Sequence, residues 1–169
     1  SDLLGQCEQT TAPPGTLAEV LLTLDEVAVL PASHALARKP VLELADFAGE
    51  QFVSLSADDP YRRIIDARFA DAGVSRTLRV ETHSAAAVCA MVEHGLGLAI
   101  VNPVTALAAA GERLVLRRLA FSIPFSVAAL LPLYRAPLPE VAPMLDALRA
   151  QTAHVVAQVV ARLAAAGTP

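Results

Sequence analysis

Short apolar segments alternate along this chain with segments of helical spacing, and this alternation restricts the possible folds more than any other feature. The apolar segments predict strands at 22–31, 51–55, 78–81, 98–101, 114–116 and 126–131. Strands that alternate with helices are typical of an α/β fold with a parallel sheet. The hydrophobic content of 54% with 4% aromatic residues fits such a sheet, because its buried strands must then be built from Ala, Val, Leu and Ile.

Proline and glycine mark the ends of the predicted helices. Asp59 and Asn102 each precede a proline, which combines a favourable N-cap with the residue best suited to the first helical position. A glycine ends each of these two helices. Further helices are predicted from 82–84 to Gly95 and from 138–140 to 166.

Three of these helices begin directly after predicted strands. In a parallel sheet their N-termini gather at one edge, where free N–H groups and the helix dipoles favour a bound carboxylate. The side chains expected there are hydroxyls, amides and acids, a mixture that suits a small zwitterion. These candidate residues are Ser54, Ser56, Asp58, Asp59, Tyr61, Thr82, His83, Ser84, Asn102 and Thr105.

Most of these candidates also have an interpretation without a ligand. Helix capping alone explains Asp59, Asn102 and one of Thr82 or Ser84. Tyr61 suits a surface position and Asp58 a solvated loop, whereas no cap requires the hydroxyls of Ser54 and Ser56. Both interpretations stay open. The guanidinium groups of Arg62 and Arg63 also suit a carboxylate, although at least one of two adjacent helix residues must face solvent.

Charge and motif content argue against several functions. The net charge is −4 and the 13 Lys and Arg residues are scattered, so this chain is not expected to bind DNA by itself. No leader-like start and no apolar segment of about 18 residues is found, which favours a cytoplasmic protein without membrane contact. Metal-ligand spacings, nucleotide loops and a GxSxG motif are absent, so no metal, cofactor or enzymatic activity is expected.

The two cysteines, Cys7 and Cys89, lie far apart in sequence and are expected to be reduced thiols. An enzyme could use Cys89 as a nucleophile with His83 as its base. A cysteine in mid-helix between Val88 and Met91 is more typical of a core residue.

Three stretches resemble the sensing domain of LysR-type transcription regulators. VLPASHALA at 29–37 is similar to the passage in which the family's chain leaves its first lobe for its second. LADFAGEQFVSLS at 44–56 resembles the segment that follows, and VETHSAAAVCAMVEHGLGLAIVNPVTAL at 80–107 resembles the family's sensor helix and next strand. The resemblance covers about 2–148. The sequence at 80–107 is most similar to that of the family's regulators of lysine biosynthesis, and regulators of octopine and nopaline catabolism have similar sequences there.

This resemblance implies an α/β fold of two Rossmann-like lobes of the periplasmic-binding-protein type, with an effector in the cleft between them. Lobe one would comprise 1–31 and 120–169, and lobe two 32–119. The first lobe would be truncated at its N-terminus, which would leave strand edges and apolar surface uncovered. The family's winged helix-turn-helix would be absent, so DNA contact would need that missing domain. A homodimer or homotetramer is implied.

The resemblance also assigns roles at the site. The family's ligand loop in the second lobe is matched by Ser54, Ser56 and Tyr61. The start of its sensor helix is matched by Thr82, His83 and Ser84. Asn102 and Thr105 would lie at the lobe junction. The implied effector is an amino acid, with diaminopimelate or lysine the leading candidates, whose ammonium group Asp58 or Asp59 would hold. A solute-binding protein that feeds a transporter shares this fold and is the alternative.

Overall fold

The computed structural model describes residues 12–135 and 138–166, and the chain divides into two compact units. Unit 1 comprises residues 1–24 and 124–157, and unit 2 comprises residues 25–123 and 158–169. The lobe boundaries expected from the sequence stay a prediction.

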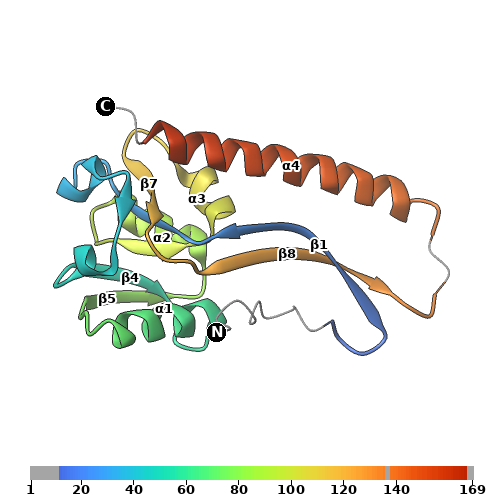
Figure 1. Cartoon of the computed structure of the whole chain (residues 1–169), viewed down its shortest axis with the longest axis horizontal. Coiled ribbons are helices and arrows are strands. Elements are labelled where there is room, and N and C mark those ends of the chain that lie inside the picture. Colours follow the sequence, from blue (N-terminus) through green and yellow to red (C-terminus); the bar gives the residue numbers. More distant parts are fainter. Residues whose placement is uncertain (1–11, 136–137, 167–169) are drawn as a thin grey trace, which may run out of the picture. The chain divides into compact units, whose positions relative to one another are not determined.

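Unit 1 is built on two long strands and most of a long helix. Strand β1 (Thr16–Asp25) pairs with β8 (Pro124–Pro132) in a two-stranded sheet, and the two run in opposite directions (Figure 1). Helix α4 (Val141–Ala165) starts in this unit, where Arg149 of the helix and Glu19 of β1 form an ion pair of 2.7 Å. Leu22 and Leu145 are buried here, whereas many other large apolar side chains of the unit are exposed.

The strands of unit 2 form a mixed arrangement. A four-stranded sheet has the order β3-β7-β2-β6, and a parallel bridge from Phe52 to Leu98 joins it to the parallel pair of β4 and β5. Strand β2 is antiparallel to both of its neighbours, β6 and β7. The strand bounds are Val27–Pro31 for β2, Val41–Leu42 for β3, Gln51–Leu55 for β4, Thr77–Thr82 for β5, Ala99–Val101 for β6 and Leu114–Leu119 for β7.

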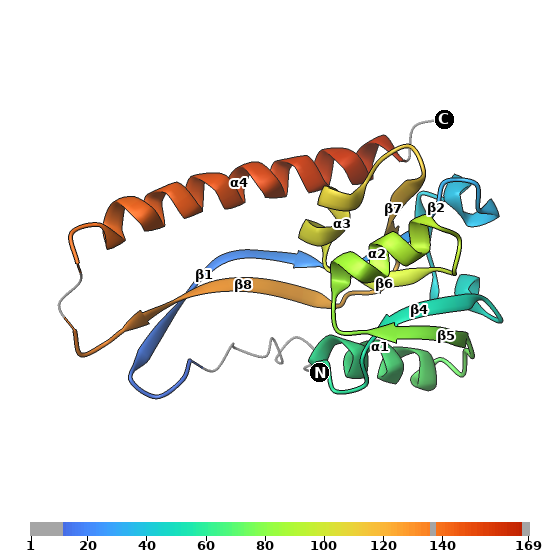
Figure 2. The same cartoon turned by 180° about the vertical axis from the view of Figure 1, so that it is seen from behind.

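Three helices of unit 2 each follow a strand directly. Helix α1 (Pro60–Asp71) follows β4, α2 (Ala85–Glu93) follows β5, and α3 (Pro103–Ala109) follows β6 (Figure 2). Two single-turn 3-10 helices, Ala35–Arg38 and Leu44–Phe47, lie between β2 and β4.

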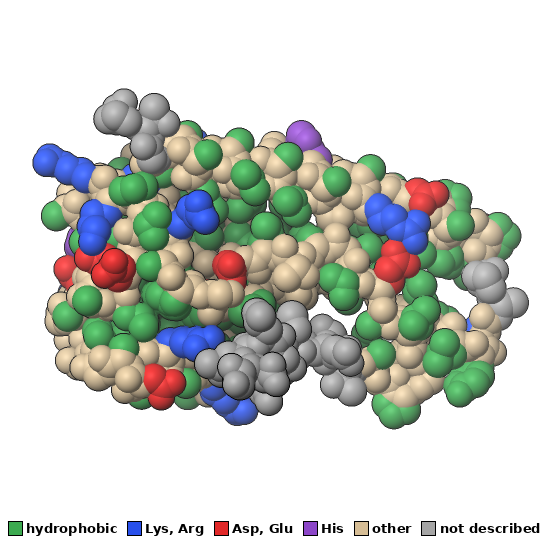
Figure 3. All heavy atoms as spheres, viewed as in Figure 1, with side chains coloured by type: hydrophobic (Ala, Val, Ile, Leu, Met, Phe, Trp, Pro, Cys, Tyr) green, Lys and Arg blue, Asp and Glu red, His purple; other side chains and the backbone are tan. Residues whose placement is uncertain are grey.

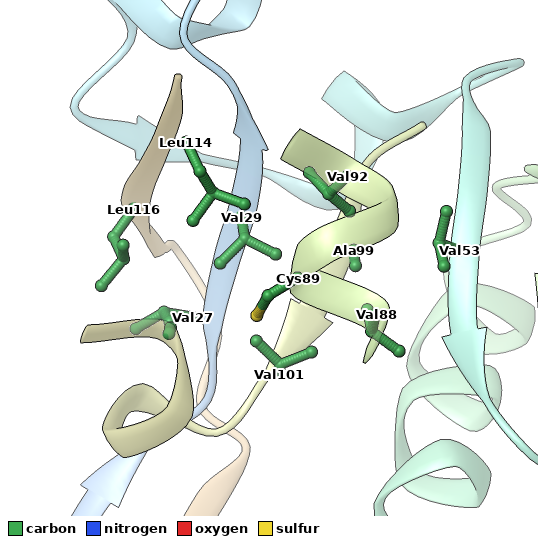
Figure 4. Close-up of a cluster of buried hydrophobic side chains, with 11 residues drawn as sticks. Val27, Val29, Val53, Val88, Cys89, Val92, Ala99, Val101, Leu114 and Leu116 are labelled. Carbon is green, nitrogen blue, oxygen red and sulfur yellow. The ribbon is translucent and has the colours of Figure 1, made fainter. Parts of the chain in front are cut away.

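The core of unit 2 has a cluster on each face of its strands because successive side chains of a strand point to opposite faces. Val27 and Val29 of β2 belong to the cluster that contains α2 and α3 residues, and Cys89 lies among these valines (Figure 4). Ala28 and Leu30 belong to the second cluster, which contains Ile65 and Phe69 of α1. The strands are therefore covered by helices on both faces.

Several predicted elements are confirmed. The strand at 51–55 matches β4, and the helices after Asp59 and Asn102 begin at Pro60 and Pro103. Cys89 is a buried free thiol, as predicted, whereas Cys7 lies outside the described residues. Within the described residues, the structure contains no helix that is both long and apolar enough to cross a membrane.

Two predictions about the strands are wrong. The strand predicted at 22–31 is two strands, β1 and β2, separated at Glu26, whose N–H donates to the carbonyl of Ile123 at 2.9 Å. The sheet is not parallel throughout, because β2 runs against β6 and β7. Both differences arise from strand pairing between residues that are distant in sequence. Strand β2 forms its ladders with β6 and β7, at residues 99–101 and 114–117, and the sequence of 22–31 does not specify these partners.

Candidate functional site

The starts of α1 and α2 lie next to each other at one edge of the strands. The parallel register pairs Leu55 with Thr82, and the N–H of Ser56 donates to the Thr82 carbonyl at 3.0 Å. Strand β6 runs parallel to β4 through the Phe52–Leu98 bridge, so α3 starts at the same edge. We call the residues that follow β4, β5 and β6 the carboxyl edge. The structure thus brings the predicted site residues to one side of unit 2.

Helix capping occupies several of the predicted ligands. The Asp59 carboxylate accepts hydrogen bonds from the N–H groups of Tyr61 at 2.8 Å and Arg62 at 3.2 Å. The Asn102 side chain accepts one from the N–H of Thr105 at 2.8 Å. These two side chains therefore stabilise the first turns of α1 and α3, as the interpretation without a ligand expects.

The start of α2 shows weaker capping. The Ser84 hydroxyl accepts a hydrogen bond from the N–H of Ala87 at 3.3 Å, and the Thr82 hydroxyl accepts one from the N–H of Ser84 at 3.4 Å. Both distances lie beyond the usual range for such bonds. These two hydroxyls can therefore turn to a ligand at little cost to the helix.

Ser56, His83 and Asp58 form a small polar group on the outside of the carboxyl edge. Ser56 Oγ and His83 Nδ1 are 2.8 Å apart, and His83 Nδ1 and Asp58 Oδ1 are 3.9 Å apart. The side chains of His83 and Asp58 are 83% and 75% exposed. Water surrounds this group, so an ion pair with Asp58 would add little binding energy.

Ser54 differs from the other hydroxyl-bearing candidates because it is buried. The residue is 3% exposed, and no hydrogen bond of its hydroxyl is found among the described residues. Tyr61 is half-buried and packs against the cluster that contains Ile65 and Phe69. Thr105 is half-buried in the first turn of α3. The Ser54 hydroxyl is thus a polar group that a bound ligand could satisfy.

The two arginines at the start of α1 have different environments. Arg62 is buried and donates to the Leu55 carbonyl at 2.8 Å, to Glu81 at 2.9 Å and to Asp66 at 2.8 Å. These bonds tie α1 to β4 and β5 and leave Arg62 little capacity for a ligand. Arg63 is exposed to solvent.

Glu26 lies beside the carboxyl edge, directly before β2, and was not among the residues predicted for the site. It is 3% exposed, and burial together with the nearby Asp59 carboxylate raises its pKa from 4.5 to about 8. Its position follows from the antiparallel register, which pairs Val27 with Val101 and sets Glu26 beside the end of β6. The only available signal was the acidic pair Asp25 and Glu26 within the apolar segment at 22–31.

Cys89 does not have the properties of a nucleophile. Burial raises the pKa of its thiol from 9.0 to about 11, so the reactive thiolate is disfavoured at neutral pH. The side chain packs in the core with Val29 and Val101. Its role in this structure is packing.

Two open cavities of unit 2 lie away from the predicted ligands. One of about 430 Å³ is lined by Ala32, Ser33, His34, Ala35 and Arg38. Another of about the same volume is lined by residues around Pro31, His94 and Arg113. Neither of these two cavities is lined by a residue of the carboxyl edge.

Comparison with known proteins identifies the family. The model of the LysR substrate binding domain matches residues 4–153. The chain is 50% identical over 132 residues to the transcriptional activator protein LysR of Escherichia coli, covering 78% of this chain and 42% of that protein. It is 31% identical over 141 residues to the regulatory protein NocR of Agrobacterium tumefaciens, covering 81% of this chain and 47% of that protein.

Solved structures show the same fold. The regulatory domain of CcmR from Synechocystis, in complex with 2-PG, has a TM-score of 0.67 at 19% identity and covers 81% of this chain and 67% of that one. HinK, a LysR family transcriptional regulator from Pseudomonas aeruginosa, has a TM-score of 0.66 at 22% identity and covers 85% of this chain and 50% of that one. The chain spans less than half the length of the curated relatives that it matches. By its match to the family model and its identity to LysR, the chain belongs to the LysR substrate binding domain family.

Proposed function

We propose that this chain senses an amino acid, diaminopimelate or lysine or a close relative, as the effector-binding domain of a regulator of lysine biosynthesis. The observation that carries the proposal is the convergence of three helix starts at the carboxyl edge. The weakly capped N-terminus of α2 and the hydroxyls of Thr82 and Ser84 would hold a carboxylate of the effector. Ser54, Ser56, Tyr61, Asn102 and Thr105 would complete the contacts.

The comparisons support a small-molecule effector. The CcmR regulatory domain was solved with 2-PG, and the effector binding domain of QuiR was solved with shikimate. The identity of 50% to LysR favours an effector connected with lysine, and it favours a regulator over a transporter's solute-binding protein.

The remaining partners follow from the same proposal. DNA would be bound by a separate domain of the whole regulator, because Lys and Arg side chains are dispersed singly over the face shown in Figure 3. The whole regulator would act in the cytoplasm as a homodimer or homotetramer, with α1 as the contact helix of this unit.

Calorimetric titration of diaminopimelate, lysine and arginine into the full-length protein tests the proposal. The double variant Thr82→Ala, Ser84→Ala removes two hydroxyls from the carboxyl edge. Its affinity for the preferred amino acid should fall about tenfold or more for each lost charge-assisted bond. Its stability should fall by only about 1 kcal/mol, because a single weak cap is lost.

The control is Ser75→Ala, which removes an exposed hydroxyl before β5, at the opposite end of that strand. This variant should bind with unchanged affinity. If capping were the only role of Thr82 and Ser84, the double variant would melt at a lower temperature and bind as tightly as the wild type. That result would remove both residues from the site.

A further inference from the structure

Glu26 is a buried carboxyl group, and the part of the chain that the structure describes holds no cation paired with it. The residue is 3% exposed, and among residues 12–135 and 138–166 no ion pair or hydrogen bond of its side chain is found. Burial of an ionised carboxylate without a partner is costly, and proteins usually pair such a group. A buried and unpaired carboxyl group is therefore a candidate for binding a cationic group of a ligand.

The strand register sets Glu26 among the helix starts of the carboxyl edge. Val27 pairs with Val101, so the antiparallel ladder continued by one residue places Glu26 opposite Asn102, the cap of α3. Alternation along β2 gives Glu26 the same face as Ala28 and Leu30, the face that α1 covers. Glu26 therefore lies beside the start of α3 along the ladder and on the face of β2 that α1 covers.

The charged groups near Glu26 disfavour its ionised form in the absence of a bound cation. Asp59, at the start of α1, is close enough for its negative charge to act on Glu26. The Asp25 carboxylate accepts a hydrogen bond of 2.5 Å from the Ser122 hydroxyl and brings no positive charge, and Asn102 is neutral. Arg62 is the buried arginine of α1, and its ion pairs with Asp66 and Glu81 occupy it.

We propose that the Glu26 carboxylate binds an ammonium group of the effector and so makes the site select amino acids over plain carboxylic acids. This inference rests on the proposed function, in which the start of α2 holds the effector's carboxylate. It replaces Asp58 and Asp59 in the ammonium role, because Asp58 is 75% exposed and Asp59 caps α1. A buried ion pair discriminates strongly, since a ligand without the ammonium would leave Glu26 unpaired.

Binding of the ammonium should expel a proton. Because its pKa is about 8, free Glu26 holds a proton at pH 6.5. When an ammonium group binds, the ionised carboxylate becomes the favoured form, and its proton passes to the solvent. Near pH 6.5, each bound effector should thus release up to about one proton.

The test uses three ligands with one carbon skeleton: pimelate, 2-aminopimelate and diaminopimelate, which carry none, one and two ammonium groups. Each is titrated by calorimetry into the full-length protein at about pH 6.5, in two buffers that differ in ionisation enthalpy. In the wild type, addition of an ammonium group should strengthen binding at least about tenfold and be accompanied by proton release. Glu26→Gln should lose both the gain in affinity and the release of the proton.

Two variants complete the design. Glu26→Asp keeps a carboxyl group and should retain the proton release with weaker binding. Glu112→Gln removes an exposed acid of the same unit and should behave as the wild type. Urea unfolding of each variant shows that it is folded before titration.

The outcomes separate this inference from the proposed function. If Glu26→Gln keeps both the preference for the ammonium and the proton release, the assignment of Glu26 is overturned, while amino-acid binding stands. If the wild type binds pimelate as tightly as diaminopimelate, the assignment is again overturned. If the wild type binds no ligand of the series, the proposed function fails and the assignment fails with it.

Discussion

Glu26 illustrates how the burial of one acidic side chain can oppose the stability of a fold. Its carboxyl group is nearly free of water contact and lies near a second acid, so the folded chain favours the protonated form. In the unfolded chain the same group ionises with its usual pKa of 4.5. The difference makes the stability of the domain depend on pH.

The expected dependence has a definite sign. Because the folded pKa of Glu26 is raised, its contribution is fully present below about pH 4.5 and is lost as the pH rises through about 8. Between pH 5 and pH 8.5 the free energy of unfolding should fall by about 4 kcal/mol from this group. Urea unfolding at the two pH values measures the change. Glu26→Gln should remove most of this change in the free energy of unfolding, and Glu112→Gln should leave it intact. An equal change between the two pH values in the wild type and both variants would contradict the burial of Glu26.

Local sequence signals predicted the capping residues Asp59 and Asn102 correctly. They gave no indication that Glu26 is buried near the predicted site. An acid or amide followed by proline defines a helix start within a few residues, so Asp59 and Asn102 could be placed without a structure. The environment of Glu26 depends on the end of β6, more than 70 residues later in the chain. Its neighbours in sequence give no indication of that pairing.

At the scale of elements, β4 and the starts of α1 and α3 were predicted at their observed positions. The division of the segment 22–31 into β1 and β2 was not predicted. An apolar segment indicates that its residues are buried, but it does not indicate which strand it pairs with or in which direction. Strand β3 was also missed, since its two residues, Val41 and Leu42, are too few for a recognisable alternation.

Gly97 fixes the close approach of the loop before β6 to β4. Its φ is 152°, and a Cβ at this position would lie 2.5 Å from the carbonyl oxygen of Gln51. Gly97→Ala should therefore lower the free energy of unfolding by on the order of 2 to 3 kcal/mol, because the backbone must shift or strain. Thermal or urea unfolding measures this loss.

Gly111→Ala is the matched control for that substitution. A Cβ at Gly111 meets no atom within 4 Å, so this variant should unfold within about 0.5 kcal/mol of the wild type. Equal stability of the two variants would show that the contact between Gly97 and Gln51 does not constrain the sheet.

At the scale of the molecule, the two units differ in how well they cover their apolar side chains. Unit 2 contains two buried clusters, one on each face of its strands. In unit 1, large side chains such as Leu17, Val20, Leu130 and Tyr134 are at least half exposed. The candidate site lies on the well-packed unit, which suits the rigid positioning that a binding site requires.

Amide hydrogen exchange on the full-length protein, with and without diaminopimelate, measures whether the effector binds at the carboxyl edge. We expect slower exchange at the starts of α1, α2 and α3, around residues 56–62, 82–87 and 102–105, because a ligand bound there would restrict the opening of these three segments. Exchange that slows instead around the cavity at 32–38, with these three segments unchanged, would contradict it.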